Sequence, residues 1–511
     1  MKIIGNIILR TVDPKKIGNN LFFMFSVFGI LLSILTIIIS KDVRVTIAVI
    51  AFNLLVSFIN NMPLYRRIPG SIILSFNVAI FYSLPMVYIS YKYSLYDFTL
   101  YFGAPGPNSI YFDALPVAIW FLIISLIMLY FGMFIGDSIK INKSKITMET
   151  NPVVKPYKNI GRLLFITLFV VFLAIRDSID SFNAISNASV KNVNLLAFLF
   201  NDRAFFLICP FVFYSLGHNP LNRLKYKIAY LFLFLMYNLV LLQGTSKGAI
   251  LNSFEYLFLY PLAFYYNSNK KIYWPSWSMF FFLFIMIVPL FVYGTVKRQN
   301  DMQGLFFNID TYMSFLNKSL ANGILQQIEV VFCRLSSSFQ NYVIIFTHFF
   351  ENYSAEYALH YAVYVFQAFL NIVLPGTPFP NAYIPSSQLL NNVLMHEDLI
   401  GFGDSYSFWA HANTQPYTIF GVLFILFGPF LTIPALIVLG YMFTYAYNYT
   451  SNKLFRVLLL THLSIILHIY GIETSIQITI HAFIVGLIVT YIMNLPNFKI
   501  FIKKNAHFVL R

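Results

Sequence analysis

The sequence predicts an all-α, polytopic integral membrane protein with about 12 transmembrane helices and one large external loop. Of the 511 residues, 59% are hydrophobic and 10% are charged, whereas soluble domains have roughly 25% charged residues. Apolar runs long enough to cross a bilayer follow one another from Leu21 to Val296 and from Tyr417 to Met493. We therefore interpret 1–511 as a single membrane domain and the polar stretch 297–415 as its large external loop.

The first apolar run, Leu21–Ile39, is predicted to be a retained helix. Basic residues precede it, but it is too long for the core of a signal peptide and has no clear A-x-A cleavage site. The other candidate spans are 43–59, 71–91, 115–135, 163–175, 195–216, 228–243, 248–266, 277–296, 417–447, 455–470 and 475–493. The run 417–447 is too long for one upright helix, and we expect Pro429 and Pro434 to kink it, because proline lacks an amide proton and clashes with the preceding turn.

The basic residues predict the orientation of the chain. Twelve spans place both termini on one side, and that side carries 23 of the 34 Lys and Arg, against 10 on the other side. Cytoplasmic loops are enriched in Lys and Arg, so both termini are predicted to be cytoplasmic and the large loop external. The net charge of +15 lies in alternate loops and not on one soluble face, so the lipid bilayer is the expected partner and nucleic acid is not.

The large loop is not uniformly polar. Gly323–Phe350 has apolar residues at helical spacing, and Tyr357–Leu374 is almost entirely apolar. These stretches predict either two amphipathic helices that lie on the membrane or a hairpin that dips into it. Pro375–Pro416 is rich in Pro, Gly, Asn and Ser and is predicted to be a loop.

Arg203 is an arginine inside a predicted span, next to Asp202. Such a residue normally faces a bundle interior or a water-filled cavity and has a partner. One interpretation is a local pair with Asp202 near a helix break. The other is a cation in a cavity that receives an anionic head group.

Further basic residues recur where predicted spans reach the external side: Arg176, Lys247, Lys297, Arg298 and Arg334. Each alone fits an anchor that extends its charge to the interface. Together they fit a diphosphate site, because glycine and Ser/Thr neighbours let backbone amides approach the same anion as the side-chain cations.

His411 is the candidate base, since it lies just before the span 417–447, between the external loop and the membrane. A histidine can transfer protons near neutral pH. Asp404, in the same loop, is a candidate to orient it or to bind substrate. The alternative is an interfacial histidine beside Trp409. The sequence has no metal-ligand, P-loop or GxSxG motif, so we expect chemistry without a metal or cofactor.

Three stretches resemble the O-antigen polymerase (Wzy) family of bacterial inner-membrane proteins and the related O-antigen ligases. GTSKGAIL (244–251) is similar to the family's S-R-G stretch, with Lys247 where arginine is usual. GTVKRQND (294–301) resembles the basic entry to the family's long periplasmic loop. AHANTQPYTIFGVLFILFGPF (410–430) resembles the ligase stretch H-N-x-x-L…G-x-x-G, with His411 at the histidine position and Ala412 between it and Asn413.

The resemblance implies a polytopic glycosyltransferase of the inner membrane. It would transfer a growing polysaccharide from undecaprenyl diphosphate to a new lipid-linked oligosaccharide repeat unit at the periplasmic face. Arg298 and His411 would be catalytic, and Arg176, Arg203, Lys247, Lys297, Arg334 and Asp404 would bind substrate. A chain-length regulator and a flippase would be partners. The alternatives are a lipid-linked oligosaccharide flippase, which would need two similar halves that this chain does not have, and an O-antigen ligase, which differs in its acceptor.

Overall fold

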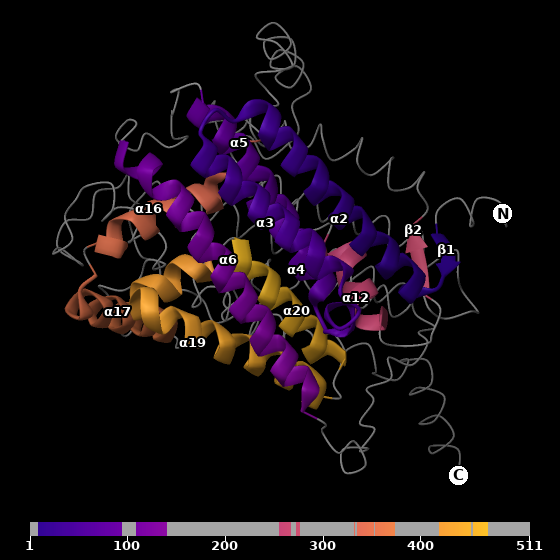
Figure 1. The fold of residues 1–511 in the computed structure, drawn as a ribbon. Coiled ribbons are helices and arrows are strands. Elements are labelled where there is room, and N and C mark those ends of the chain that lie inside the picture. The colour runs from indigo at the N-terminus through magenta and orange to yellow at the C-terminus, as the bar shows by residue number, and fades with distance from the viewer. Residues whose placement is uncertain are drawn as a thin grey trace, which may run out of the picture.

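The computed structural model describes residues 9–94, 109–139, 255–266, 272–275, 332, 335–351, 353–373, 418–450 and 453–468. These residues are helical apart from one two-stranded antiparallel ribbon (Figure 1). The long helical elements are α2 (Pro14–Ile39), α3 (Val43–Asn61), the run α4–η2–α5 (Ser71–Val78, Ala79–Ser83, Leu84–Ser94), α6 (Ser109–Ser138) and α19 (Ile419–Tyr449). The shorter elements are η1 (Tyr65–Arg67), η5 (Glu255–Leu259), α12 (Tyr260–Tyr266), α16 (Ser337–Glu351), α17 (Ala355–Val373) and α20 (Lys453–His468), with strands β1 (Leu9–Val12) and β2 (Ile272–Pro275).

Within the described residues, five helices are long and apolar enough to cross a membrane. They coincide with the predicted spans 21–39, 43–59, 71–91, 115–135 and 417–447, and the shorter helix α20 coincides with 455–470. The chain is thus helical and has the character of a membrane protein. The predicted span 248–266 is described only over 255–266, where it is helical. The predicted spans 163–175, 195–216, 228–243, 277–296 and 475–493 lie outside the described residues, so the total of about 12 stays a prediction.

Helices α2 and α3 form a hairpin held together by small residues (Figure 1). The Ser26 hydroxyl donates to the Ser57 carbonyl (3.2 Å), and the Ser57 hydroxyl donates to the Ser26 carbonyl (2.9 Å). A Cβ atom on Gly29 would lie 2.4 Å from Ser57 Oγ, so only glycine permits this approach. Membrane helices commonly pack in this way, through small residues and interhelical hydrogen bonds.

The third long helical run contains a π-helical turn, η2, between α4 and α5. Pro85 lies two residues beyond the end of this turn. Because proline has no amide proton, it cannot bond to the carbonyl of Phe81 one turn earlier, which accounts for the wider turn at this point. The run nevertheless continues as one helical element to Ser94.

Helices α6 and α19 make the closest backbone contact among the long helices (Figure 1). Gly132 and Gly136 form a G-x-x-x-G motif on α6, and Gly440 faces them from α19. A Cβ atom on Gly132 would lie 2.1 Å from the carbonyl oxygen of Ile437, and one on Gly440 would lie 2.3 Å from that of Leu129. Only residues without a side chain therefore allow the two helices to approach this closely.

The contacts along this pair also give its direction. The rings of Phe121 and Phe424, in the first halves of α6 and α19, are 5.2 Å apart. Near the helix ends, Asn448 Nδ2 donates to Asp137 Oδ1 (3.0 Å). The two helices therefore run parallel, which is the relative direction that the predicted topology assigns to spans 115–135 and 417–447.

Contacts at the ends of the bundle agree with the same relative topology. Arg44 at the start of α3 pairs with Asp113 at the start of α6, and both starts are predicted to be external. The ribbon pairs β1 with β2 in the register Leu9↔Pro275 and Val12↔Ile272, and both strands are predicted to be cytoplasmic. Which of the two ends faces the cytoplasm stays a prediction from the charge distribution.

Helix α19 is broken at Gly428, where φ is 66° and ψ is −174°, directly before Pro429. The predicted kink at Pro429 is therefore confirmed, whereas the backbone stays helical at Pro434. Thr432 Oγ1 donates to the carbonyls of Gly428 (2.6 Å) and Leu423 (3.0 Å). Side-chain donors thus satisfy carbonyl groups at a break where the regular backbone bonds are lost.

Helix α16, from the predicted external loop, is part of the helical bundle. It packs against α6 and α19, and its Phe339, Tyr342 and Phe346 side chains are fully buried. Tyr342 donates to the carbonyl of Ala118 on α6 (3.0 Å). This packing attaches the helix to the bundle, and whether the segment dips into the membrane or lies on its surface stays a prediction. Helix α17 presents a row of exposed apolar residues: Leu359, Val363 and Phe366.

Candidate functional site

The eight residues predicted to form the site lie outside the described residues. They are Arg176, Arg203, Lys247, Lys297, Arg298, Arg334, Asp404 and His411. Their grouping around one substrate therefore stays a prediction. The described residues contain a different candidate site, built around a carboxyl group in the middle of the helical bundle.

Glu255 is the centre of this buried polar cluster. It is the first residue of the π-helical turn η5, and Tyr260, the first residue of α12, follows it by five positions. Asn77, in the last turn of α4, and Ser464, on α20, complete the cluster. All four side chains are at most 2% exposed. Three segments that are distant in sequence thus meet at one acid.

Hydrogen bonds connect all members of the cluster to the acid. Asn77 Nδ2 donates to Glu255 Oε1 (2.6 Å), and Ser464 Oγ is in hydrogen-bond contact with Glu255 Oε2. Asn77 Nδ2 also lies 3.1 Å from Ser464 Oγ and donates to the carbonyl of Ile73 (2.9 Å). The Tyr260 hydroxyl is 3.5 Å from Glu255 Oε2. Among the described residues, the groups that face this carboxyl group are all neutral.

The electrostatics of this arrangement are unusual. Among the described residues, the side chains that contact the Glu255 carboxyl group are those of Asn77, Ser464 and Tyr260, and none of these carries a positive charge. Burial of a charge without a counter-charge is costly, so an acid inside a membrane bundle indicates a functional role more often than a structural one. The π-helical turn that carries Glu255 is itself a type of element that occurs frequently at functional sites.

Sequence reasoning missed Glu255, although the signal was present. Glu255 lies inside the predicted span 248–266, and an ionisable residue in a span is the same feature that drew attention to Arg203. Its partners were not detectable, because Asn77 and Ser464 are 178 and 209 positions away from it.

No family model, no curated protein and no solved structure matches the chain. Within the described residues, no group of three or more His, Cys, Asp or Glu is placed to hold a metal ion. The functional interpretation therefore depends on the chain's own residues.

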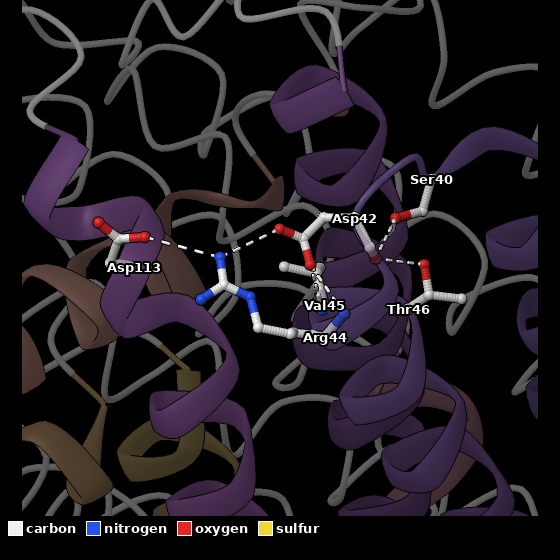
Figure 2. A network of polar contacts seen from close by, with 6 residues as sticks. All are labelled: Ser40, Asp42, Arg44, Val45, Thr46 and Asp113. Carbon is white, nitrogen blue, oxygen red and sulfur yellow. Dashed lines mark hydrogen bonds and ion pairs between the residues drawn. The ribbon is translucent and has the colours of Figure 1, made fainter.

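A second polar cluster lies at the starts of α3 and α6 (Figure 2). Asp42 caps α3 by accepting from the amides of Arg44 (2.7 Å) and Val45 (3.2 Å). The Arg44 guanidinium lies between two carboxylates, 3.3 Å from Asp42 and 3.7 Å from Asp113. Because the Arg44 and Asp113 side chains are 64% and 72% exposed, this is a surface pair of small energetic value. It joins the starts of two helices.

Two arginines at the opposite end have structural roles. Arg66 donates to the carbonyl of Asn60 (2.8 Å), and its guanidinium lies 5.7 Å from the centre of the Phe22 ring. Arg456 donates to the carbonyl of Thr450 (2.8 Å) and lies 5.3 Å from the centre of the Tyr447 ring. Both arginines bond back to a carbonyl six residues earlier and contact an aromatic ring. These predicted cytoplasmic cations therefore hold turns as well as orienting the chain.

Proposed function

We propose that this protein polymerises oligosaccharide repeat units linked to undecaprenyl diphosphate at the periplasmic face of the bacterial inner membrane. In the reaction, the bond between the anomeric carbon of the donor sugar and the diphosphate breaks. A hydroxyl group of the acceptor unit forms the new glycosidic bond, and its proton passes to His411. Arg298, with the other external cations, stabilises the negative charge on the departing lipid diphosphate. No metal or cofactor takes part in this scheme.

The observation that carries the proposal is the packing of α16. This helix belongs to the predicted external loop, yet its buried face lies against the first halves of α6 and α19, through contacts such as Phe346–Phe121 and Phe346–Phe424. We infer from this anchoring that the loop forms part of the membrane domain. It is suited to hold a hydrophilic sugar chain beside a lipid-bound diphosphate. Arg334 precedes α16 by three residues in the sequence, and His411 precedes α19 by eight.

The decisive test is polymerisation by the purified chain in lipid nanodiscs. Lipid-linked oligosaccharide from native cells is the substrate, a chelator is present, and product length is measured by gel electrophoresis. We expect His411→Ala to reduce the rate by roughly 100-fold or more, the contribution typical of a general base, while substrate binding is retained. The matched control is His218→Ala, in a predicted cytoplasmic loop, which should leave the rate unchanged. Full activity of the His411 variant would refute the assigned role.

A lipid-linked oligosaccharide flippase is the second candidate, and one observation favours it. The buried cluster of Glu255, Asn77 and Ser464 joins three helical segments, and transporters place ionisable groups inside the bundle at their coupling sites. The two functions separate in vesicles that contain labelled lipid-linked oligosaccharide. A flippase moves the label between leaflets without lengthening it, whereas the polymerase lengthens it. An O-antigen ligase would instead transfer the chain to a different lipid acceptor.

A further inference from the structure

We propose that Glu255 is a proton-binding site in the membrane domain. Its carboxyl group holds a proton in the described arrangement, and loss of that proton to water weakens the contact between α4, η5–α12 and α20. The only bond that breaks is the O–H bond of the acid, and the proton passes to bulk water. This proposal does not depend on polymerase activity.

The hydrogen-bond geometry favours the neutral acid. Glu255 Oε2 is in hydrogen-bond contact with Ser464 Oγ, Ser464 Oγ lies 3.4 Å from Asn77 Oδ1, and Asn77 Nδ2 lies 2.6 Å from Glu255 Oε1. With a proton on Oε2, the acid donates to Ser464, the Ser464 hydroxyl donates to Asn77, and the Asn77 amide donates back to the acid. The ring closes, and the second amide hydrogen of Asn77 goes to the carbonyl of Ile73 (2.9 Å).

The ionised acid cannot satisfy the same groups. The Ser464 hydroxyl must then donate to the carboxylate, and Asn77 Oδ1 loses its donor within the ring. The negative charge would also be buried without a cation among its described partners, which are Asn77, Ser464 and Tyr260. Both effects favour the protonated acid over the ionised one, because buried charges and buried unpaired polar groups are each costly.

The surrounding elements contain other titratable groups, and the experiment must separate them from Glu255. Helix α4 carries none, and η5–α12 adds only tyrosines. The titratable residues of α20 are Lys453, Arg456, His462 and His468, and those at the start of α2 are Lys15 and Lys16. His462 is an ionisable residue two positions from Ser464, so it requires its own control.

The proposal predicts a definite pH dependence. If the folded state holds a proton on Glu255 and the unfolded state does not, the unfolding equilibrium constant rises by up to about tenfold for each pH unit, so stability falls as pH rises. Glu255→Gln should remove the contribution of Glu255 to this dependence and stay folded, because the glutamine amide can donate to Ser464 and its carbonyl can accept from Asn77. The glutamine variant keeps the ring closed without a titratable proton.

The experiment uses the full chain in nanodiscs and combines infrared spectroscopy with thermal unfolding across a pH series. We expect a protonated-carboxyl C=O band that disappears at high pH, is absent in Glu255→Gln and persists in the exposed-acid control Glu356→Gln. Ser464→Ala should shift the band, because it removes the group that accepts the acid's proton, and His462→Gln should leave the band in place. These readouts need no substrate, so they can fail or succeed independently of polymerisation.

Three results would overturn the proposal. The first is a wild-type band that is still present in Glu255→Gln, or that does not move in Ser464→Ala. The second is a Glu255→Gln variant that fails to fold, because the closed ring requires this variant to be tolerated. The third is an unfolding equilibrium constant of the wild-type chain that rises with pH no more steeply than that of Glu255→Gln, because Glu255 would then hold no more protons in the folded state than in the unfolded state.

Discussion

Substitution of Gly132 by alanine tests the contact between α6 and α19. The new Cβ atom would lie 2.1 Å from the carbonyl oxygen of Ile437, whereas ordinary van der Waals contact begins at 3.4 Å. The obstacle is backbone, so no side chain can turn away, and the helices must separate by about 1.3 Å, the difference between these two distances. Overpacking of this kind costs roughly 1–3 kcal/mol of unfolding free energy.

The measurement is the unfolding free energy of purified protein in mixed micelles. Gly421→Ala is the matched control, because its Cβ atom would meet only the end of the Ile345 side chain, at 3.0 Å. We expect Gly132→Ala to be destabilised clearly more than this control. We also expect the double variant Gly132→Ala/Gly440→Ala to lose less than the sum of the single losses, because one separation of the helices relieves both clashes. Equal stability of Gly132→Ala and the control would refute the close approach of α6 and α19.

Two further predictions concern the break in α19 and the donor site. Tyr353→Phe removes the hydroxyl that donates to the carbonyl of Leu426 near the break (3.3 Å), so it should lower the unfolding free energy by about 1 kcal/mol, and an unchanged thermal unfolding curve would show that this bond is not formed. Arg298→Ala should abolish long polysaccharide chains at normal protein levels, and Arg298→Lys should restore them only partly if contact with the diphosphate is bidentate. Arg44→Ala, a predicted external arginine with an exposed side chain, is the control and should leave chain length unchanged.

The sequence was sufficient to predict the described spans because a span is a local property. Hydropathy over about 20 residues locates it, and Leu21–Ile39 and 43–59 fall inside or on α2 and α3. The break in α19 was also predictable, since proline acts on its own preceding turn. The ribbon of β1 and β2 was not, because each strand has four residues and gains its hydrogen bonds only from a partner more than 250 positions away.

Features that join distant segments show most clearly what the sequence alone cannot predict. The G-x-x-x-G motif of Gly132 and Gly136 is visible in the sequence, but only the structure identifies α19 as the helix that it contacts. The same holds for function. A single charged residue in an apolar run is a local signal, and it indicated Arg203 and should have indicated Glu255. What such a residue does depends on its partners, and for Glu255 these are an amide and a hydroxyl group rather than a cation. A local anomaly can therefore reveal that a site exists, whereas its chemistry becomes interpretable only once the fold has brought the partners together.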